Sequence, residues 1–316
     1  MQPRLGGHER SRPPRARGRR MPETTNMKPT TRLRIQAAVL SALILIVLLA
    51  LWHVATLSVA DSAASTTLTP EQIEYQKMLG KDPAATSAKS AGFPTLAQMG
   101  DTVVRNLAHP FYDNGPNDKG IGIQLGWSLL RVGLGFGLAA IVAIPLGFLI
   151  GMSPLVYRAL DPFIQVLKPI SPLAWMPIAL YTIKDSSISG IFVIFICSVW
   201  PMLINTAFGV SNVRREWLNV ARTLEVTPLR KAFQVILPAA APTILTGMRI
   251  SMGIAWLVIV AAEMLVGGTG IGYFVWNEWN NLALTNVIFA ILVIGLVGMA
   301  LDLLFARAQK AVSYVD

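Results

Sequence analysis

The stretch SNVRREWLNVARTLEVTPLRKAFQVILP, residues 211–238, is a basic and polar interruption between two long apolar runs. A segment with so many charges cannot lie in the hydrocarbon core of a bilayer, so we place it on a membrane face. Its Lys and Arg residues indicate the cytoplasmic face. The pattern predicts two short helices that meet at a bend near Val226, a shape that a cytoplasmic partner can contact. The alternative is an ordinary amphipathic helix that lies in the membrane interface.

The composition of the whole chain also indicates a membrane protein. Of its 316 residues, 53% are hydrophobic and only 14% are charged, whereas soluble domains carry about 25% charged residues. The single cysteine, Cys197, excludes a disulfide within one chain, and the three histidines form no metal-ligand cluster. The sequence contains no combination of nucleophile, base and metal. We therefore expect no catalytic residue, no metal site and no enzymatic activity.

The net charge of +10 does not require a nucleic-acid partner. Much of the positive charge lies in residues 1–34, and the rest lies mainly where apolar runs end. The tendency of Lys and Arg to remain in the cytoplasm accounts for this distribution. We therefore expect the chain to be embedded in a lipid bilayer and to bind no nucleic acid.

Apolar runs long enough to cross a bilayer predict an all-α membrane protein with six transmembrane helices. The runs are residues 35–57, 125–151, 162–183, 188–210, 244–265 and 287–305. The second run contains Gly133, Gly135, Gly137, Gly147 and Gly151, and small residues of this kind let helices approach closely in lipid. The third run is broken by Pro169, Pro172 and Pro177. Such breaks are tolerated where protein or a water-filled cavity satisfies the freed carbonyls.

The chain divides into four segments on this interpretation. Residues 1–34, rich in Arg and Pro, form a disordered basic arm in the cytoplasm, within which Met21 and Met27 are alternative starts. Residues 35–59 form the first transmembrane helix, an uncleaved signal-anchor. Residues 60–120 form an external linker with short helices, for example at 69–79, and residues 121–310 form the core with five transmembrane helices. The placement of Lys and Arg predicts that both termini are cytoplasmic.

The interruption at 211–238 resembles a known loop. The run NVARTLEVTP from Asn219, closed by Leu237 and Pro238, resembles the EAA loop of binding-protein-dependent ABC importer permeases. Ala221, Leu237 and Pro238 match the family pattern. Asn219 and Val220 replace the first two residues of the loop, and Glu225 stands where Gly is usual. The last replacement matters because Glu adopts left-handed backbone conformations less freely than Gly.

Three other stretches resemble a narrower group, the nitrate-type permeases and their sulfonate, taurine and cyanate relatives. They are PFIQVLKPISPLAWMPIALY (162–181), AWLVIVAAEMLVGGTGIGYFVWNEWNN (255–281) and VIGLVGMALDLLFAR (293–307). The resemblance covers roughly residues 120–310. It implies the type I ABC importer permease fold, with six transmembrane helices and a cytoplasmic coupling-helix loop, in a bacterial inner membrane.

The resemblance also implies the partners. They are two cytoplasmic ABC ATPase subunits, an external solute-binding protein and a second permease subunit, which we expect to be a second copy of this chain. ATP is bound by the ATPase partner, and this chain needs no cofactor, since it contains no G-x-x-x-x-G-K-[ST] sequence. The expected coupling residues are Asn219, Val220, Ala221, Arg222, Glu225, Leu237 and Pro238.

Four residues are candidates for the translocation path: Arg131, Pro172, Trp175 and Glu263. Arg131 offers a planar fork of donors to a trigonal anion such as nitrate, and the alternative is that its side chain reaches outward to the membrane interface. A carboxylate would repel an anion, so we expect Glu263 to act in a gate or in packing, paired with an Arg or with backbone donors. Lys168, beside the proline-broken third span, is expected at a cytoplasmic flank, with a ligand in the pore as the alternative. Asp302 is expected near the cytoplasmic edge beside Arg307.

The sequence leaves three alternatives to a nitrate or nitrite importer. The same architecture can import a sulfonate, taurine or cyanate. An ion-coupled secondary transporter is a different class, but it usually needs titratable groups at mid-membrane or paired broken helices, and only one proline-broken span is evident. A membrane enzyme is disfavoured by the missing catalytic cluster.

Overall fold

The computed structural model describes residues 29–64, 74, 93–115 and 118–312, and the regular structure within these residues is helical apart from one isolated bridge between Asp113 and Lys119. The helices are α1 (Pro29–Ala64), α4 (Leu96–Ala108), α5 (Ile121–Met152), α6 (Pro154–Leu167), α7 (Pro172–Ile183), α8 (Ser186–Ser211), α9 (Arg215–Thr223), α10 (Pro228–Lys231), the π-helix η1 (Ala232–Ile236), α11 (Leu237–Val266), α12 (Ile271–Asn280) and α13 (Leu284–Val312). The prediction of an all-α protein is confirmed.

The number of apolar helices also agrees with the expectation of six spans. Within the part of the chain that the structure describes, five helices are long and apolar enough to cross a membrane, and the count rises to six when α6 and α7 are taken as one broken span. The helices are longer than the apolar runs that predicted them. A transmembrane helix can extend beyond the hydrocarbon core, because polar residues at its ends can lie in the membrane interface.

The chain divides after Val54 into two units, so the apolar part of α1 is described by itself. Its apolar side chains are exposed around the whole helix; Leu40, Leu43 and Ile46 are each more than half exposed. A helix that is apolar all round fits a lipid environment. Residues 29–34, which we expected in a disordered arm, belong to α1. Residues 1–28 and the predicted helix at 69–79, apart from Glu74, lie outside the described residues.

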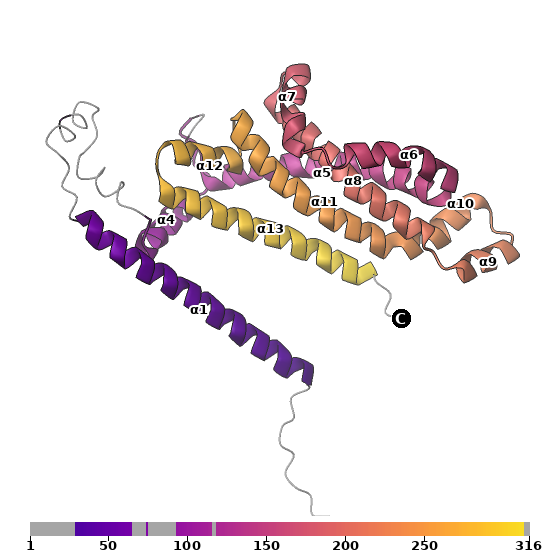
Figure 1. Cartoon of the computed structure of the whole chain (residues 1–316), viewed down its shortest axis with the longest axis horizontal. Coiled ribbons are helices and arrows are strands. Elements are labelled where there is room, and N and C mark those ends of the chain that lie inside the picture. The colour runs from indigo at the N-terminus through magenta and orange to yellow at the C-terminus, as the bar shows by residue number, and fades with distance from the viewer. Residues whose placement is uncertain (1–28, 65–73, 75–92, 116–117, 313–316) are drawn as a thin grey trace, which may run out of the picture. The chain divides into compact units, whose positions relative to one another are not determined.

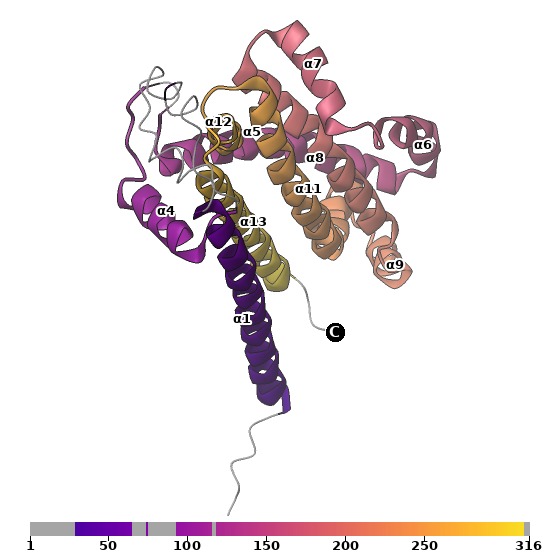
Figure 2. The same cartoon turned by 60° about the vertical axis from the view of Figure 1, so that its left-hand side comes forward.

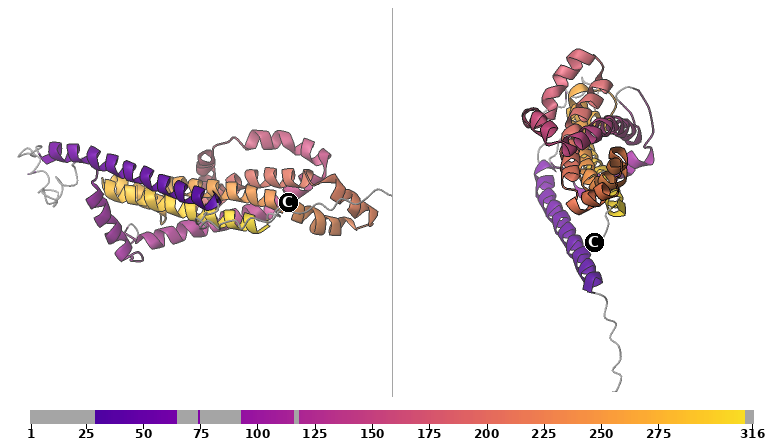
Figure 3. Two further views of the ribbon diagram at one scale, coloured as in Figure 1. Left: turned by 90° about the horizontal axis from the view of Figure 1, so that it is seen from below. Right: turned by 90° about the vertical axis from the view of Figure 1, so that its right-hand side faces the viewer.

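In the second unit, α5, α8 and α11 pack side by side (Figures 1 and 3). Glycines on α5 make this close approach possible. A Cβ at Gly147 would lie 2.7 Å from the carbonyl oxygen of Leu203, and one at Gly135 would lie 2.7 Å from Ile194. The expected close packing is therefore confirmed for these glycines and for Gly151. Gly133 and Gly137 are different, because open space surrounds them.

The expected third span is two helices, α6 and α7, which meet at 89°. The break lies at residues 168–171, and α7 begins at Pro172. Pro177 does not break the helix, which continues through it to Ile183. Helix α6 has no buried residue, whereas α7 packs Met176 and Ala179 against α8 and α11.

The interruption at 211–238 lies at one end of the bundle, and α12 lies at the opposite end (Figures 1 and 2). Two short helices were expected there, but only α9 is separate. Helix α10 passes through η1 into α11, so that one 39-residue segment, Pro228–Val266, forms the fifth span. A small core of Val210, Val213, Ile236, Ala240 and Ile244 fixes this segment to the end of α8.

Candidate functional site

The turn after α9 has the geometry of a Schellman motif. The N–H of Val226 donates to the carbonyl of Ala221 at 3.1 Å, and the N–H of Glu225 donates to the carbonyl of Arg222 at 3.0 Å. Glu225 has φ +48°. The motif requires a left-handed residue at this position, usually Gly. Glu225 therefore preserves the turn while it adopts a conformation that costs a non-glycine residue about 1 kcal/mol.

The expected coupling residues fall into two groups. Asn219, Val220, Arg222 and Glu225 are exposed around the turn, whereas Ala221 is buried, with 3% of its surface exposed. Leu237 and Pro238 lie in the first turn of α11. Ala221 therefore holds the turn in place from inside. The exposed apolar face of α9 consists of Trp217, Val220 and Leu224.

A buried ion pair joins α5 to α11 at the opposite end of the bundle. Arg131 Nη1 lies 2.8 Å from Glu263 Oε1. Arg131 is 8% exposed and Glu263 is 4% exposed. Because an uncompensated charge in such a place is strongly destabilising, each residue depends on the other. The expectation that Glu263 pairs with an Arg or with backbone donors is confirmed.

The same carboxylate holds the start of α12. The N–H of Gly272 donates to Glu263 Oε2 at 3.0 Å, and the hydroxyl of Ser128 lies 2.7 Å from that oxygen. The first N–H groups of a helix have no hydrogen-bond acceptor within the helix. At the start of α12, side chains of other helices provide these acceptors. Ser128 Oγ accepts from Ile271 N–H at 2.9 Å, and Gln124 Oε1 accepts from Gly270 N–H at 2.5 Å. Helices α5 and α11 thus determine where α12 begins.

Glycine is needed next to this carboxylate because there is no space for a side chain. A Cβ at Gly270 would lie 2.2 Å from Glu263 Cδ, and a Cβ at Gly272 would lie 2.1 Å from the carbonyl oxygen of Val260. The Gly-rich segment between α11 and α12 therefore wraps around Glu263. Two of its members, Gly267 and Gly268, also have positive φ angles of 78° and 97°.

Arg131 makes two further hydrogen bonds through Nη1 and Nη2, whereas its buried Nε has no hydrogen-bond partner among the described residues. Nη1 also donates to the carbonyl of Thr269 at 2.6 Å, and Nη2 donates to Ser187 Oγ at the start of α8, at 3.0 Å. The guanidinium also lies 5.8 Å from the centre of the Trp127 ring. The alternative that Arg131 reaches outward to the membrane interface is therefore wrong. Its side chain connects α5, α8, α11 and the loop before α12.

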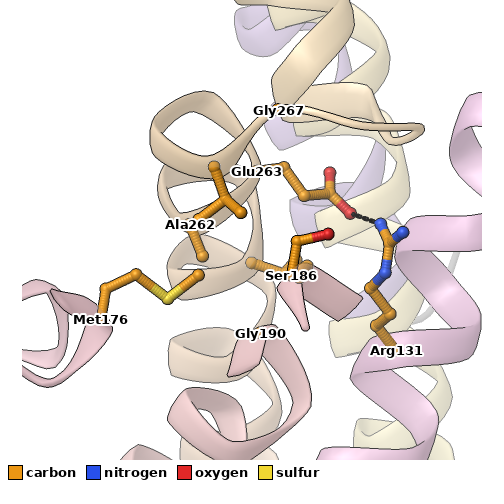
Figure 4. Close-up of a pocket in the computed structure, with 9 residues that line it drawn as sticks. Arg131, Met176, Ser186, Gly190, Ala262, Glu263 and Gly267 are labelled. Carbon is orange, nitrogen blue, oxygen red and sulfur yellow. Dashed lines mark hydrogen bonds and ion pairs between the residues drawn. The ribbon is translucent and has the colours of Figure 1, made fainter. Parts of the chain in front are cut away.

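The space beside the ion pair is small (Figure 4). The cavity lined by Arg131, Met176, Ser186 and Glu263 has a volume of about 10 Å³ for solvent centres, roughly what one water molecule needs. A polyatomic anion does not fit there in this conformation. The arrangement is suited to holding helices together or to opening as a gate.

Pro172 and Trp175 lie away from this ion pair. Both line a groove of about 480 Å³ between α7, α8 and α11, which also contains Lys168 and Asn205. The structure therefore brings Arg131 and Glu263 together and places the other two path candidates elsewhere. Among the described residues, no group of His, Cys, Asp and Glu side chains is arranged to hold a metal ion.

A second ion pair was not predicted. Arg249 of α11 and Asp302 of α13 form two parallel hydrogen bonds, Nε to Oδ1 and Nη2 to Oδ2, each 2.6 Å long. The partner of Asp302 is thus Arg249, whereas the sequence suggested Arg307 as its neighbour. The two side chains remain 38% and 50% exposed. The available signal was Asp302, the one charged residue of the run 287–305, and Arg249, which shares the run 244–265 with Glu263.

A bundle of apolar helices with an exposed polar loop at one end has the architecture of a multi-pass membrane protein. Residues 143–314 match the family of binding-protein-dependent transport system inner membrane components, and the chain belongs to this family. Membership makes the chain an inner-membrane permease subunit of an ABC importer, which works with a separate ATPase and a binding protein.

Relatives with this architecture are similar over most of the core. The chain is 45% identical over 226 residues to the nitrate import permease protein NrtB of Synechocystis sp., a match that covers 72% of this chain and 82% of that protein. It is 49% identical over 198 residues to NrtB of Leptolyngbya laminosa, covering 63% and 71%. It is 45% identical over 208 residues to the bicarbonate transport system permease protein CmpB of Synechocystis sp., covering 66% and 74%.

Solved structures share the fold at low sequence identity. A chain of the inward-facing MetNI methionine ABC transporter aligns with TM-score 0.55 and 13% identity, covering 61% of this chain and 96% of that one. A chain of an amino acid ABC transporter aligns with TM-score 0.54 and 12% identity, covering 70% and 100%. The predicted type I ABC importer permease fold is confirmed.

Proposed function

We propose that this chain is the translocating subunit of an ATP-driven importer of nitrate. The observation that carries the proposal is the 45% identity over 226 residues to a nitrate import permease. The protein is a non-catalytic subunit: ATP is hydrolysed by the partner, and this chain forms the path. Nitrite, which is also a small anion with one negative charge, is a second substrate on the same grounds.

The exposed face of α9 is the contact for the ATPase. Trp217, Val220 and Leu224 are 46%, 58% and 69% exposed, and exposed apolar side chains next to one another mark a protein contact. Because Ala221 and the Schellman turn fix this face to the loop, a partner that moves the turn moves α9 as a unit.

The fifth span offers a route from the turn to the ion pair. Residues Pro228–Val266 form one helical segment, and Glu263 lies near its far end. A displacement at the coupling loop is therefore passed along α11 to the Arg131–Glu263 pair and to the start of α12. In this proposal Glu263 and Arg131 act as a gate whose closed form is described here, while Pro172 and Trp175 line the path.

The remaining partners follow from the family. A solute-binding protein delivers nitrate at the α12 end, and a second copy of the chain completes the path. The C-terminal helix α13 runs toward the α9 end (Figure 1), which supports a cytoplasmic C-terminus on this proposal. The cytoplasmic N-terminus is proposed from the distribution of Lys and Arg alone.

Bicarbonate is a second candidate, because the chain is also 45% identical to a bicarbonate permease over 208 residues. Nitrate and bicarbonate are both planar anions with a single charge, so the permease alone can treat them alike.

The test is uptake into vesicles that carry the complete complex and its binding protein. Labelled nitrate should accumulate when ATP is supplied and not when a non-hydrolysable analogue replaces it. Accumulation of labelled bicarbonate without nitrate would assign the second candidate. Uptake of taurine or an alkanesulfonate alone would reject both anions and leave the importer assignment in place. Uptake driven by an ion gradient without ATP would reject the importer itself.

A further inference from the structure

We propose that Lys168 binds the transported anion, a small planar oxyanion with one negative charge, in the groove between α7, α8 and α11. The proposal rests on the proposed function and assigns a residue of the path to it. The groove is lined by residues of α7, α8 and α11 and of the break between α6 and α7. Helix α7 packs against α8 and α11, and Figure 2 shows the course of these helices.

The groove is large enough for such an anion. Its volume is about 480 Å³, whereas the cavity beside Arg131 measures about 10 Å³. Its lining combines polar and apolar side chains, as binding sites for small molecules usually do. The polar members are Lys168, Ser171, Trp175, Trp200 and Asn205.

The charge of this groove favours an anion. Lys168 is its only ionisable lining residue apart from the Cys197 thiol, and no carboxylate lines it. Two other large grooves differ in this respect. The groove between α5, α6 and α8, which Lys168 also lines, contains Asp161 and Arg158, and the groove between α11 and α13 contains Asp302 paired with Arg249. A cation without a carboxylate beside it leaves a positive potential that attracts a negative solute.

Lys168 is also available. Its side chain is exposed, and no ion pair or hydrogen bond to that side chain is formed within the described part of the chain. The carboxylate of Asp161, on the preceding helix, is engaged by Gln165 Nε2 at 2.7 Å. Asp161 and Lys168 form no ion pair in the described part of the chain, so no direct carboxylate contact holds the ammonium group.

The other polar residues can complete the coordination of a planar anion. The indole N–H groups of Trp175 and Trp200 and the hydroxyl of Ser171 are donors without charge. Asn205 already donates through Nδ2 to the carbonyl of Pro201 at 2.8 Å, and Nδ2 carries a second hydrogen. Ile196, Ile250 and Ile254 line the same groove. Apolar walls strengthen the attraction between the ammonium group and an anion by lowering the local dielectric constant.

The depth of the groove separates Lys168 from an ordinary cytoplasmic flank. Trp200 and Asn205 lie about 21–28 Å along α8 from Ser186, in a helix of about 39 Å, at 1.5 Å per residue. Lys168 lines the groove at this level, at the break between α6 and α7. An ionisable residue at such a depth normally faces a substrate path or a water-filled cavity. The break in the third span thus provides a binding position for the anion in the cytoplasmic half of the translocation path.

The first experiment compares Lys168→Met, Lys168→Arg and the control Arg158→Met in the complete complex with its binding protein. Arg158 lies on α6 and lines the neighbouring groove. Nitrate uptake by Lys168→Met should fall about tenfold or more, the loss expected for one hydrogen bond to a charged group. Lys168→Arg and Arg158→Met should stay within about threefold of the wild-type rate, a factor too small to represent such a bond. ATPase stimulation by the loaded binding protein should persist in all three, because the coupling loop is intact.

The second experiment restores the charge chemically. In a Cys197→Ser background, Lys168→Cys treated with 2-aminoethyl methanethiosulfonate acquires a side chain close to lysine. Uptake should recover with this reagent and not with its sulfonatoethyl counterpart, which adds a negative charge.

The outcomes are distinguishable. A wild-type complex that imports neither nitrate nor bicarbonate would overturn the proposed function and this proposal with it. An active wild-type complex with an equally active Lys168→Met variant would overturn this proposal alone, and so would recovery with both reagents. Vesicles of purely zwitterionic lipid separate a lipid phosphate from the transported anion. If the defect of Lys168→Met disappears in such vesicles, a lipid headgroup is the ligand and the proposal fails.

Discussion

Arg131 of α5 and Glu263 of α11 form an ion pair of 2.8 Å, and the same carboxylate accepts the N–H of Gly272 at the start of α12. One interaction therefore fixes the relative position of three helices at the end of the bundle opposite the coupling loop. The contacts of this pair are those of an element that holds helices together, and the proposed role as a gate depends on whether the pair separates during transport.

The first prediction concerns the dependence of these two residues on each other. Arg131→Gln or Glu263→Gln alone should lower the stability of the detergent-solubilised complex by about 3–5 kcal/mol, because each leaves a buried charge without its partner. The double variant Arg131→Gln/Glu263→Gln should be more stable than either single variant. Thermal unfolding of all three variants tests this. A double variant whose loss equals the sum of the two single losses would mean that the residues do not interact.

The second prediction concerns Arg249 and Asp302. Each carries one charge in an apolar helix, and each is partly exposed. Arg249→Met and Asp302→Asn should each reduce the amount of folded complex recovered from the membrane. The exchange Arg249→Asp/Asp302→Arg should recover much of it, because the opposite charges still face each other. If the exchanged variant gives no more folded complex than the single variants, opposite charge alone does not stabilise this pair, and the original side-chain geometry is required.

The spans could be predicted because apolar runs of the right length have few alternatives in a bilayer. The residue at which the fifth helix begins could not be predicted. Arg230 and Lys231 were expected outside the hydrocarbon, but charged residues do not end a helix, and the helix continues from α10 through η1 into α11. Apolar periodicity marks where a helix is buried in lipid, and it does not mark where the helix begins. The prediction at Pro177 was wrong for a different reason: a proline within a helix usually breaks or kinks it, but α7 continues through Pro177 to Ile183.

The site could be predicted only in part. A buried carboxylate requires donors, so the pairing of Glu263 was foreseeable. The position of Arg131 was missed, although Gln124, Ser128 and Arg131 lie at helical spacing within an apolar run, which puts three polar side chains on one face. Arg249 and Asp302 lie on two separate helices, α11 and α13. Nothing local in a sequence shows that two such helices place their charges opposite each other.

The third prediction concerns topology. The Lys and Arg distribution places both termini in the cytoplasm and residues 60–120 outside. Reporter fusions at Ala85 and Ser313 should therefore report opposite sides of the membrane. Fusions that report the same side would rule out the six-span arrangement.

The fourth prediction concerns the contact with the ATPase. A large residue at Val220, which is 58% exposed, should block docking of the ATPase and leave membrane insertion intact. A large residue at Ala221 should block docking too, but it should also loosen the turn, because Ala221 is buried. A cross-linker at Thr223→Cys should capture the ATPase. If a Val220→Trp subunit still co-purifies with the ATPase and stimulates its turnover, this face of α9 does not contact the ATPase.

The fifth prediction concerns the backbone at Glu225. Its φ of +48° places a side chain in the left-handed region, so Glu225→Gly should stabilise the turn by about 0.5–1 kcal/mol. The hydrogen bond from Val226 N–H to the carbonyl of Ala221 closes this turn. Hydrogen exchange of that amide should therefore slow by about two- to fivefold in Glu225→Gly. Glu225→Ala removes the charge but keeps the strain, and its exchange should remain near the wild-type rate. Thr223→Gly, in the last turn of α9, should accelerate exchange, because Gly in a helix costs about 0.5–1 kcal/mol. If Glu225→Ala slows exchange as much as Glu225→Gly does, the charge is responsible and the left-handed backbone is not.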